Sequence, residues 1–227
     1  MSRASRVVVA GCPHHVTQRG NNRQDVFFVD DDRRVFVELL REAAGRFAVR
    51  IDGYCLMSNH VHLVATPRDE GGLAAALKRA NQLYTQYVNR LHGRSGHLWQ
   101  ERFFSCPLDA EHFWAALAYV ERNPVRARRV RLAWRWPWSS AAAHVGEADP
   151  SGLLDLASWR RRVRPEAWRE RLREAQDEGE MLRLRRWTSR GRPLGSDAFV
   201  ARVEVRFGRR LRALAPGRPR KGQGKRK

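Results

Sequence analysis

Residues 49–66 read VRIDGYCLMSNHVHLVAT, and this stretch decides the fold. Two runs rich in apolar and β-branched residues, Val49 to Met57 and His60 to Thr66, are separated only by Ser58 and Asn59. A connection of two residues joins neighbouring antiparallel strands in a tight turn. The stretch therefore predicts a β-hairpin.

Further elements are predicted on either side of this hairpin. Asp30 to Ala48 and Gly72 to Leu91 carry apolar residues at helical spacing, and the first of them opens on a run of Asp that complements the helix dipole. We expect a first strand from about Val7 to Arg19 and a short one from about Arg102 to Pro107. The order strand, helix, strand, strand, helix, strand is that of a ferredoxin-like domain. The predicted fold class is therefore α+β, with a ferredoxin-like antiparallel sheet and helices.

The chain divides into three segments by composition. Residues 1–145 contain the predicted sheet, and residues 146–208 read as short, Arg-rich helical pieces separated by Pro and Gly, which predicts a C-terminal helical, basic extension. Residues 209–227 are nearly all Arg, Lys, Gly, Pro and Ala, with no acidic residue. Such a segment lacks the apolar residues of a core, so we predict a disordered basic tail that binds phosphates without reading bases.

The charge of the chain points to a polyanionic partner. The 44 Lys and Arg outnumber the 24 Asp and Glu, which gives a formal net charge of +20. A field of this size favours nucleic acid. An anionic membrane is not expected, because there is no 18-residue apolar run and no long amphipathic helix with a cationic face. The apolar stretch of residues 7–10 is too short for a signal peptide, so a cytoplasmic protein is expected.

The cysteines do not form the sequence pattern of a disulfide-bonded or zinc-binding domain. Cys12, Cys55 and Cys106 are odd in number and widely spaced, which argues against disulfides and fits a reducing compartment. The run Cys12-Pro13-His14-His15 is compatible with part of a zinc site, but no Cys-x-x-Cys pair exists elsewhere to complete it. We interpret the cysteines as small core residues.

A pair of histidines lies on the second strand of the predicted hairpin. His60 and His62 are two residues apart, so their side chains point to the same face of a strand. Two neutral imidazoles placed in this way can share one divalent metal ion. Alternation on a half-buried strand also produces such pairs by chance, and a metal site needs further ligands.

The helix predicted from Asp109 to Asn123, closed by Pro124, offers polar groups that lie against such a strand. Beside its apolar stripe it carries a flank with His112, Tyr119 and Asn123, the last two one turn apart. A hydroxyl nucleophile and an oxygen ligand next to a histidine pair indicate a phosphoryl-transfer site. The alternative is a tyrosine at the edge of a core stripe. The other tyrosines fall on a helix stripe or in a strand, so Tyr119 is the best candidate nucleophile.

Several stretches together resemble a known family. Residues 15–23 (HVTQRGNNR), 53–64 (GYCLMSNHVHLV) and 119–127 (YVERNPVRA) look like successive signature blocks of the REP-associated tyrosine transposases of bacteria, in the same order and at similar spacing. Residues 96–103 (GHLWQERF) and 137–140 (PWSS) are further blocks. The resemblance covers roughly residues 7–145 and is much more specific than any one motif.

This resemblance implies a role for each matching residue. His60 and His62 would be the histidine pair of an HUH endonuclease, Asn123 would complete the metal site, and Tyr119 would be the nucleophile. The implied cofactor is Mg²⁺ or Mn²⁺, and the implied reaction nicks and rejoins DNA through a 5′-phosphotyrosine that leaves a free 3′-hydroxyl. The implied substrate is single-stranded DNA with a hairpin, such as a repetitive extragenic palindrome.

The expected DNA contacts are basic residues near these blocks, namely Arg19, Arg23, Arg102 and Arg126. Each is also compatible with an ordinary solvated surface charge. The chain departs from the family pattern at Glu101, where glycine is frequent, and at residues 128 and 129, where Arg-Arg replaces a glycine and an apolar residue. These departures bear on local turns rather than on the implied active site.

Three alternative functions remain open at this stage. The first is an HUH nickase that serves replication or conjugation, and the second is a non-catalytic DNA-binding regulator that has kept the fold. The third is a metal hydrolase that uses water, with Tyr119 as a bystander. The sequence also leaves open whether the protein is a monomer or a homodimer.

Overall fold

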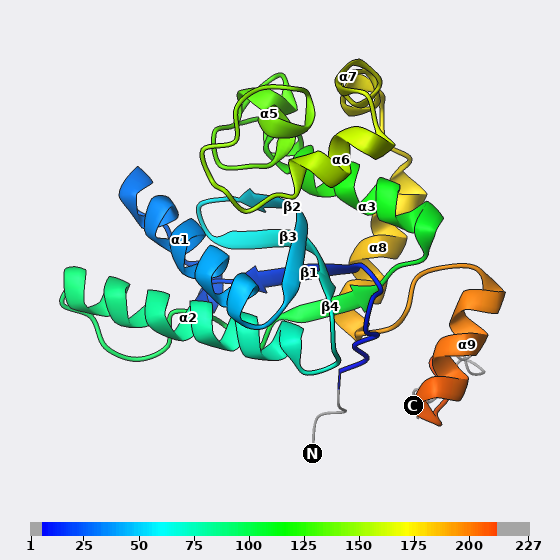
Figure 1. The fold of residues 1–227 in the computed structure, drawn as a ribbon. Helices are drawn as coiled ribbons and strands as arrows, with labels where there is room; N and C mark the ends of the chain where they lie inside the picture. The colour runs from blue at the N-terminus through cyan, green and yellow to red at the C-terminus, as the bar shows by residue number, and fades with distance from the viewer. Residues whose placement is uncertain (1–5, 213–227) are drawn as a thin grey trace, which may run out of the picture.

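The computed structural model describes residues 6–212 and has a four-stranded antiparallel sheet at its centre (Figure 1). The strands are β1 (His14–Arg19), β2 (Val49–Leu56), β3 (His60–Pro67) and β4 (Phe104–Pro107), in the spatial order β2-β3-β1-β4. Helix α1 (Asp30–Arg46) connects β1 to β2, and α2 (Gly72–Leu91) connects β3 to β4. This order and pairing are those of a ferredoxin-like fold, so the predicted fold class is confirmed.

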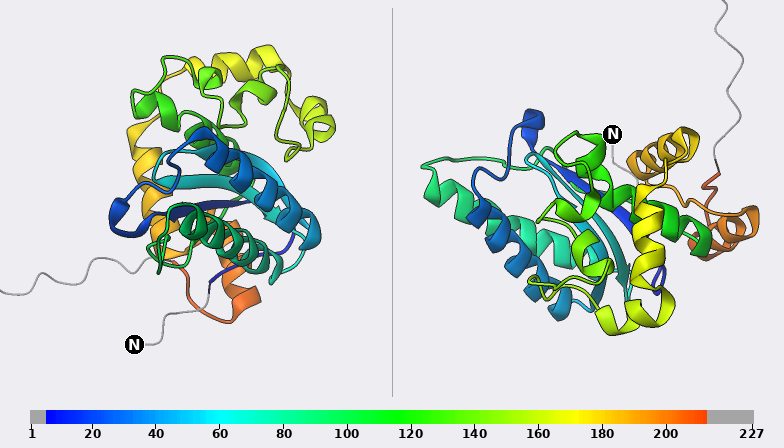
Figure 2. Two further views of the ribbon diagram at one scale, coloured as in Figure 1. Left: turned by 90° about the vertical axis from the view of Figure 1, so that its left-hand side faces the viewer. Right: turned by 90° about the horizontal axis from the view of Figure 1, so that it is seen from above.

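Helices cover both faces of the sheet (Figure 2). On one face, α1 and α2 pack over a core that includes Phe36, Leu63 and Tyr84. On the opposite face, α3 (Ala110–Glu121) packs on β2 and β3 over a second core that includes Val64 and Leu117. Because alternate side chains of a strand point to opposite faces, the even-numbered residues of β3 face α3.

The hairpin of β2 and β3 forms as predicted, with Ser58 and Asn59 in its turn. The Met57 N–H donates to the carbonyl oxygen of His60 and closes the turn. At Gly53 the strand approaches α3 so closely that a Cβ atom would lie 2.2 Å from Cδ1 of Leu117. A side chain at this position would force Leu117 to move, so the glycine lets α3 pack closely on the sheet.

The chain beyond α3 is helical, as predicted for the extension. Helix α8 packs along β4 and β1 on the same side of the sheet as α3, so the extension covers part of the central sheet (Figure 1). The short 3-10 turns are Asn21–Arg23 and Ala133–Arg135. The remaining helices are α4 (Asn123–Arg126), α5 (Ala141–His144), α6 (Leu156–Arg162), α7 (Pro165–Arg173), α8 (Glu178–Arg190) and α9 (Asp197–Phe207).

The first strand begins at His14 and not at about Val7, so this prediction was wrong by seven residues. Gly11 has φ +73° and turns the chain just before the strand. The preceding apolar residues are buried for another reason, because Val7 packs in a cluster with Phe199 and Val203 of α9. The apolar pattern therefore reflects contact with a distant helix and not strand pairing. The last strand likewise begins at Phe104 and not at about Arg102.

The predicted helix from Asp109 to Asn123 ends earlier than expected. Asp109 caps it as predicted, but α3 ends at Glu121 and the chain bends at Arg122. Asn123 then begins the short helix α4. Pro124 lies in the first turn of α4, where its missing N–H leaves no helical bond unmade.

The first residues of the predicted tail are held against α9. Leu211 is buried, and its N–H and that of Arg212 both donate to Oε1 of Glu204. Residues 213–227, which make up the rest of the predicted tail, lie outside the described part of the chain. Within residues 6–212, none of the helices has the length and apolar character needed to cross a membrane.

A fully buried carboxylate ties α7 to the central domain. Glu121, at the end of α3, accepts hydrogen bonds from Ser140 Oγ, His144 Nδ1 and, at 2.8 Å, Trp168 Nε1 of α7. Without this carboxylate, buried donors from separate elements would have no acceptor. The network therefore stabilises the first helices of the extension.

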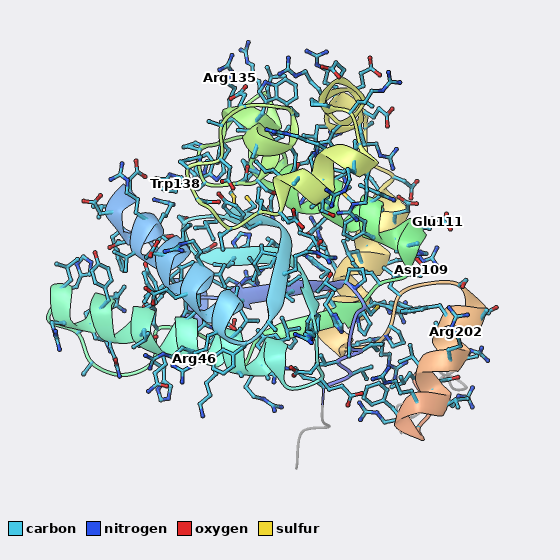
Figure 3. All side chains as sticks on the ribbon, in the orientation of Figure 1. Arg46, Asp109, Glu111, Arg135, Trp138 and Arg202 are labelled. Carbon is cyan, nitrogen blue, oxygen red and sulfur yellow. The ribbon has the colours of Figure 1, made fainter. Side chains whose placement is uncertain are left out.

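We expect Glu121→Ala to lower the free energy of unfolding by about 2–6 kcal/mol. Ser140 Oγ can still donate to the carbonyl oxygen of Tyr54, but the two other buried donors lose their acceptor, which costs about 1–3 kcal/mol for each. Urea unfolding would measure this loss. Glu111→Ala on the same helix is the matched control, since Glu111 is exposed at the outer end of α3 (Figure 3). Its loss removes only a favourable interaction with the helix dipole of about 0.3–1 kcal/mol. Equal effects of the two variants would contradict a stabilising role for the buried network.

Candidate active site

The structure brings four of the predicted site residues together in one groove of about 760 Å³. His60 and His62 come from β3, Tyr119 from the face of α3 that covers this strand, and Asn123 from the start of α4. The two imidazole ring centres are 5.0 Å apart, and the ring of Tyr119 is 5.6 Å from that of His62. Tyr119 is only 4% exposed, so a substrate would reach it through this groove.

A residue that the sequence reasoning did not assign to the site, His15, lies at the centre of it. The fully buried ring of His15 on β1 stacks on that of His62, with 5.4 Å between ring centres. Its Nε2 is 3.1 Å from Nδ1 of His62, and its Nδ1 is 2.7 Å from Oγ1 of Thr188 on α8. The two histidines and the threonine therefore form one hydrogen-bonded chain from the sheet to the extension.

The direction of the hydrogen bonds between Thr188, His15 and His62 follows from the single proton of the threonine hydroxyl. Thr188 donates that proton to the carbonyl oxygen of Leu184, so its oxygen accepts from Nδ1–H of His15. Burial, reinforced by the charge of Arg126, lowers the pKa of His15 to about 3, so the ring is neutral and its Nε2 is an acceptor. His62 consequently carries its proton on Nδ1, and its Nε2 lone pair is left available.

His60 has the same tautomer for a different reason. The side-chain amide of Asn59 donates through Nδ2 to the carbonyl oxygen of Arg23, which leaves Oδ1 facing Nδ1 of His60 at 2.6 Å. Burial, and then the charges of Arg19 and Arg126, lower the pKa of His60 to about 4. The ring is therefore neutral near pH 7, with Nδ1 protonated and Nε2 unprotonated. Burial also lowers the pKa of His62 well below its usual value.

We expect Thr188→Val to change the tautomers of both His15 and His62, because Nδ1–H of His15 would lose its only described acceptor in a buried site. Long-range ¹H–¹⁵N spectra of the imidazole rings would detect a shift toward the Nε2–H form. Thr85→Val is the matched control, since Thr85 also donates to a helix carbonyl but lies on α2. Unchanged ring signals in Thr188→Val would contradict the proposed direction of the hydrogen-bonded chain.

Two arginines contact the candidate nucleophile. Nε of Arg185 on α8 donates to the hydroxyl oxygen of Tyr119 at 3.0 Å. The guanidinium of Arg126 lies 3.9 Å above the centre of the tyrosine ring. Two nitrogen atoms of Arg126, Nε and Nη2, are buried and have no hydrogen-bond partner among the described residues. The surroundings of the tyrosine are thus strongly positive.

Asn123 lines the same groove as the histidine pair. Hydrogen bonding by its side chain partly opposes the lowering of the pKa of His60. Its Nδ2 is buried without a hydrogen-bond partner in the part of the chain that is described. The amide oxygen of Asn123 is therefore a candidate ligand beside the two imidazoles.

The donors at this position fit a divalent cation only in part. Two imidazole nitrogens and one amide oxygen are acceptable ligands for a divalent metal, although Mg²⁺ and Mn²⁺ favour oxygen. Among residues 6–212, no cluster of three or more His, Cys, Asp or Glu side chains has an arrangement that could hold a metal. None of the described residues that line the groove is acidic. Further oxygen ligands would have to come from a phosphate or from water.

The remaining predicted residues are distributed around this groove. Arg19 lines it, and Arg126 lies over Tyr119. Arg102 lines two adjoining grooves of about 540 and 410 Å³, while Arg23 is exposed outside all three. His112 does not line the groove of the histidine pair. It pairs with Asp109 and lines a neighbouring small cavity, which shares Tyr119 with the groove.

Cys55 and Cys106 are core residues, as interpreted from the sequence, and the neighbouring His14 is buried as well. Cys55 and Cys106 are fully buried, and Cys12 is partly buried. His14 is fully buried and bonded through Nδ1 to the carbonyl oxygen of Cys12 and through Nε2 to the N–H of Val9. Both ring nitrogens are thus occupied by backbone groups, which leaves none for a zinc ion.

Comparison with known proteins identifies the fold and the family. A solved structure of a REP-associated tyrosine transposase bound to a REP hairpin has 18% sequence identity and a TM-score of 0.56, and the match covers 69% of this chain and 90% of that chain. A transposase candidate from Deinococcus radiodurans R1 also has 18% identity and covers 53% of this chain and 97% of that chain, but its TM-score of 0.38 is too low to support an argument. No curated protein sequence matches this chain.

A sequence match identifies the protein family. Residues 8–123 match the family described as transposase IS200-like, which is just over half of the chain. The matched region runs from the segment before β1 to Asn123, so it contains the sheet, the histidine pair and the candidate nucleophile. The chain belongs to the IS200-like transposase family.

Proposed function

We propose that this protein nicks and rejoins single-stranded hairpin DNA through a covalent 5′-phosphotyrosine on Tyr119. The observation that carries this proposal is the single groove in which the hydroxyl of Tyr119 lies beside His60, His62 and Asn123. The solved structure of a REP-associated tyrosine transposase is bound to a REP hairpin, which supports DNA of the same class as the substrate. The net charge of +20 supports a polyanion in general.

The proposed reaction balances without any further reactant. Oη of Tyr119 attacks the scissile phosphorus, and the bond between phosphorus and O3′ breaks as the new bond forms. The phenolic proton passes to water, and the leaving 3′-oxygen takes up a proton. The phosphodiester energy is kept in the tyrosine ester, so attack by a 3′-hydroxyl rejoins DNA without ATP.

Different residues of this chain would have different roles in that reaction. His60, His62 and Asn123 line one groove, and these three side chains would hold the divalent metal, Mg²⁺ or Mn²⁺. When bound, such an ion offsets the charge of the scissile phosphate. Arg19, at the edge of the groove, and the unpartnered nitrogens of Arg126 would bind phosphate oxygens.

The DNA would continue from Tyr119 into the adjoining groove of about 410 Å³, which shares Phe104 and Ser189 with the first. Phe104 is 41% exposed and offers a face on which a base could stack. The walls of this second groove are unusually basic. Its arginines are Arg6, Arg102, Arg190, Arg192, Arg209 and Arg210.

The proposal is tested by trapping the covalent product on a hairpin oligonucleotide with a single-stranded flank, in the presence of Mg²⁺ or Mn²⁺. A 5′-phosphotyrosine retains the DNA on the 3′ side of the cut, so the denatured adduct should carry a 3′ label and not a 5′ label. A fully duplex oligonucleotide should give no adduct. Specific binding without any adduct would favour the non-catalytic regulator, and cleavage without an adduct would favour a hydrolase that uses water.

A further inference from the structure

The hydroxyl of the proposed nucleophile accepts a hydrogen bond from the C-terminal extension. Arg185 on α8 donates through Nε to Oη of Tyr119 at 3.0 Å, across 66 residues of sequence. A guanidinium has donors and no acceptor, so the tyrosine oxygen accepts in this bond. The contact therefore places the permanent positive charge of the guanidinium beside the oxygen atom that would attack phosphorus.

This arrangement is poorly matched to a neutral phenol. The guanidinium of Arg126 lies 3.9 Å above the same ring, so two like charges converge on one uncharged group. None of the described residues lining the groove is acidic, and among residues 6–212 the side-chain hydrogen bonds of the two guanidiniums go to Gln176 and Tyr119 and not to a carboxylate. The arrangement is matched to negative charge on the tyrosine oxygen or on a phosphate bonded to it.

Helix α8 is built to hold Arg185 at this point. Its N-terminus is capped by Asp177, and it ends at Gly191 in the left-handed conformation. Leu184, the residue before Arg185, is buried in the core beneath α3. One turn further along, Thr188 is bonded to His15. Arg185 itself is exposed toward the groove, so the helix is anchored on either side of it by buried residues.

We propose that Arg185 is a catalytic residue of this transposase, which stabilises the negative charge of the tyrosine oxygen during attack on DNA and during its departure when strands are rejoined. This inference rests on the proposed function of Tyr119. The Arg185 hydrogen bond strengthens as the phenolic proton leaves Oη for water, and it weakens again as the Oη–P bond forms, the P–O3′ bond breaks and the leaving 3′-oxygen takes up a proton. No proton leaves the guanidinium. The extension thus supplies part of the active site, which the matched family region of residues 8–123 does not contain.

The test measures single-turnover adduct formation at saturating hairpin oligonucleotide, together with the dissociation constant for DNA. Arg185→Met keeps the aliphatic stem and removes the charge. We expect it to slow the reaction about 100-fold, which is the usual effect of removing a donor from an oxyanion. Its DNA affinity should change by less than about tenfold. Arg185→Lys keeps a positive donor, so it should recover part of the lost rate.

Arg202→Ala is the matched control, because it removes one exposed arginine from the extension on α9, away from the groove (Figure 3). It should leave the adduct rate unchanged, and thermal unfolding should show that all variants are folded. A wild-type rate in Arg185→Met overturns the proposal, as does a loss confined to DNA affinity. Equal slowing in Arg185→Lys and Arg185→Met also overturns it, because a retained charge would then have no effect.

These outcomes are separable from a failure of the proposed function. If the wild-type protein forms no adduct, or if Tyr119→Phe forms one normally, the assignment of Tyr119 itself is wrong. If the wild type forms an adduct that Tyr119→Phe lacks, and Arg185→Met forms it at the wild-type rate, only the role of Arg185 is wrong.

Discussion

Tyr119→Phe is expected to abolish the covalent protein–DNA adduct while DNA affinity stays within about twofold of the wild type. Loss of a nucleophile lowers the rate of the chemical step by orders of magnitude, and about 10⁴-fold or more is usual in well-studied enzymes. The aromatic ring would remain in place, with its contacts to His15, His62 and the guanidinium of Arg126. Only the hydroxyl and its bond to Arg185 would be lost.

A denaturing gel with a 3′-labelled hairpin oligonucleotide measures the adduct, and fluorescence anisotropy measures binding. Tyr87→Phe is the control, because this partly buried tyrosine lies on α2, away from the histidine pair, and should keep full activity. An adduct that persists in Tyr119→Phe would move the nucleophile elsewhere. Tyr84 would be tested next, although its hydroxyl already donates to the carbonyl oxygen of Val26 in the core.

The central fold was predictable because its signals are local. The periodicity of residues 72–91 predicted helix α2 with both ends correct, and the two-residue connection at Ser58 and Asn59 predicted the hairpin. The start of β1 was not predictable in the same way. Val7, Val9 and Cys12 pack against α9, about 190 residues away, and a strand pattern does not distinguish pairing from such a contact.

The candidate site was likewise predictable where its signals are local, and not where it depends on long-range packing. Period-two alternation placed His60 and His62 on one face, and helical spacing placed Tyr119 beside them. His15 could have been found from its place on the neighbouring strand, since its position pairs with Val64 in the register of β1 and β3. Arg185 and Thr188 left no such signal, because they reach the site only through the packing of α8 on the sheet.

A second large effect is expected at the histidine pair. His60→Ala and His62→Ala should each reduce DNA cleavage more than about 100-fold, since loss of even an outer-shell partner of a metal ligand costs about 10–100-fold. Chelation of the wild type by EDTA should have the same effect, and added Mg²⁺ or Mn²⁺ should restore the wild type alone. His92→Ala is the control, because His92 is exposed beyond the end of α2.

Because of the positive charges around the groove, we expect the affinity of the site for a metal ion to depend on bound DNA. Burial is the main cause of the low pKa of His60, and the positive charges of Arg19 and Arg126 lower it further, so the same field that disfavours a proton on the ring also disfavours a metal cation. A DNA phosphate would offset that field and supply an oxygen ligand. We therefore expect Mn²⁺, followed by electron paramagnetic resonance, to bind more tightly in the presence of a hairpin oligonucleotide than in its absence. This gain should be lost in His62→Ala and kept in His92→Ala.

Full cleavage in the presence of EDTA, or equal Mn²⁺ affinity with and without DNA in an active wild-type protein, would show that the histidine pair does not hold the metal in the way proposed.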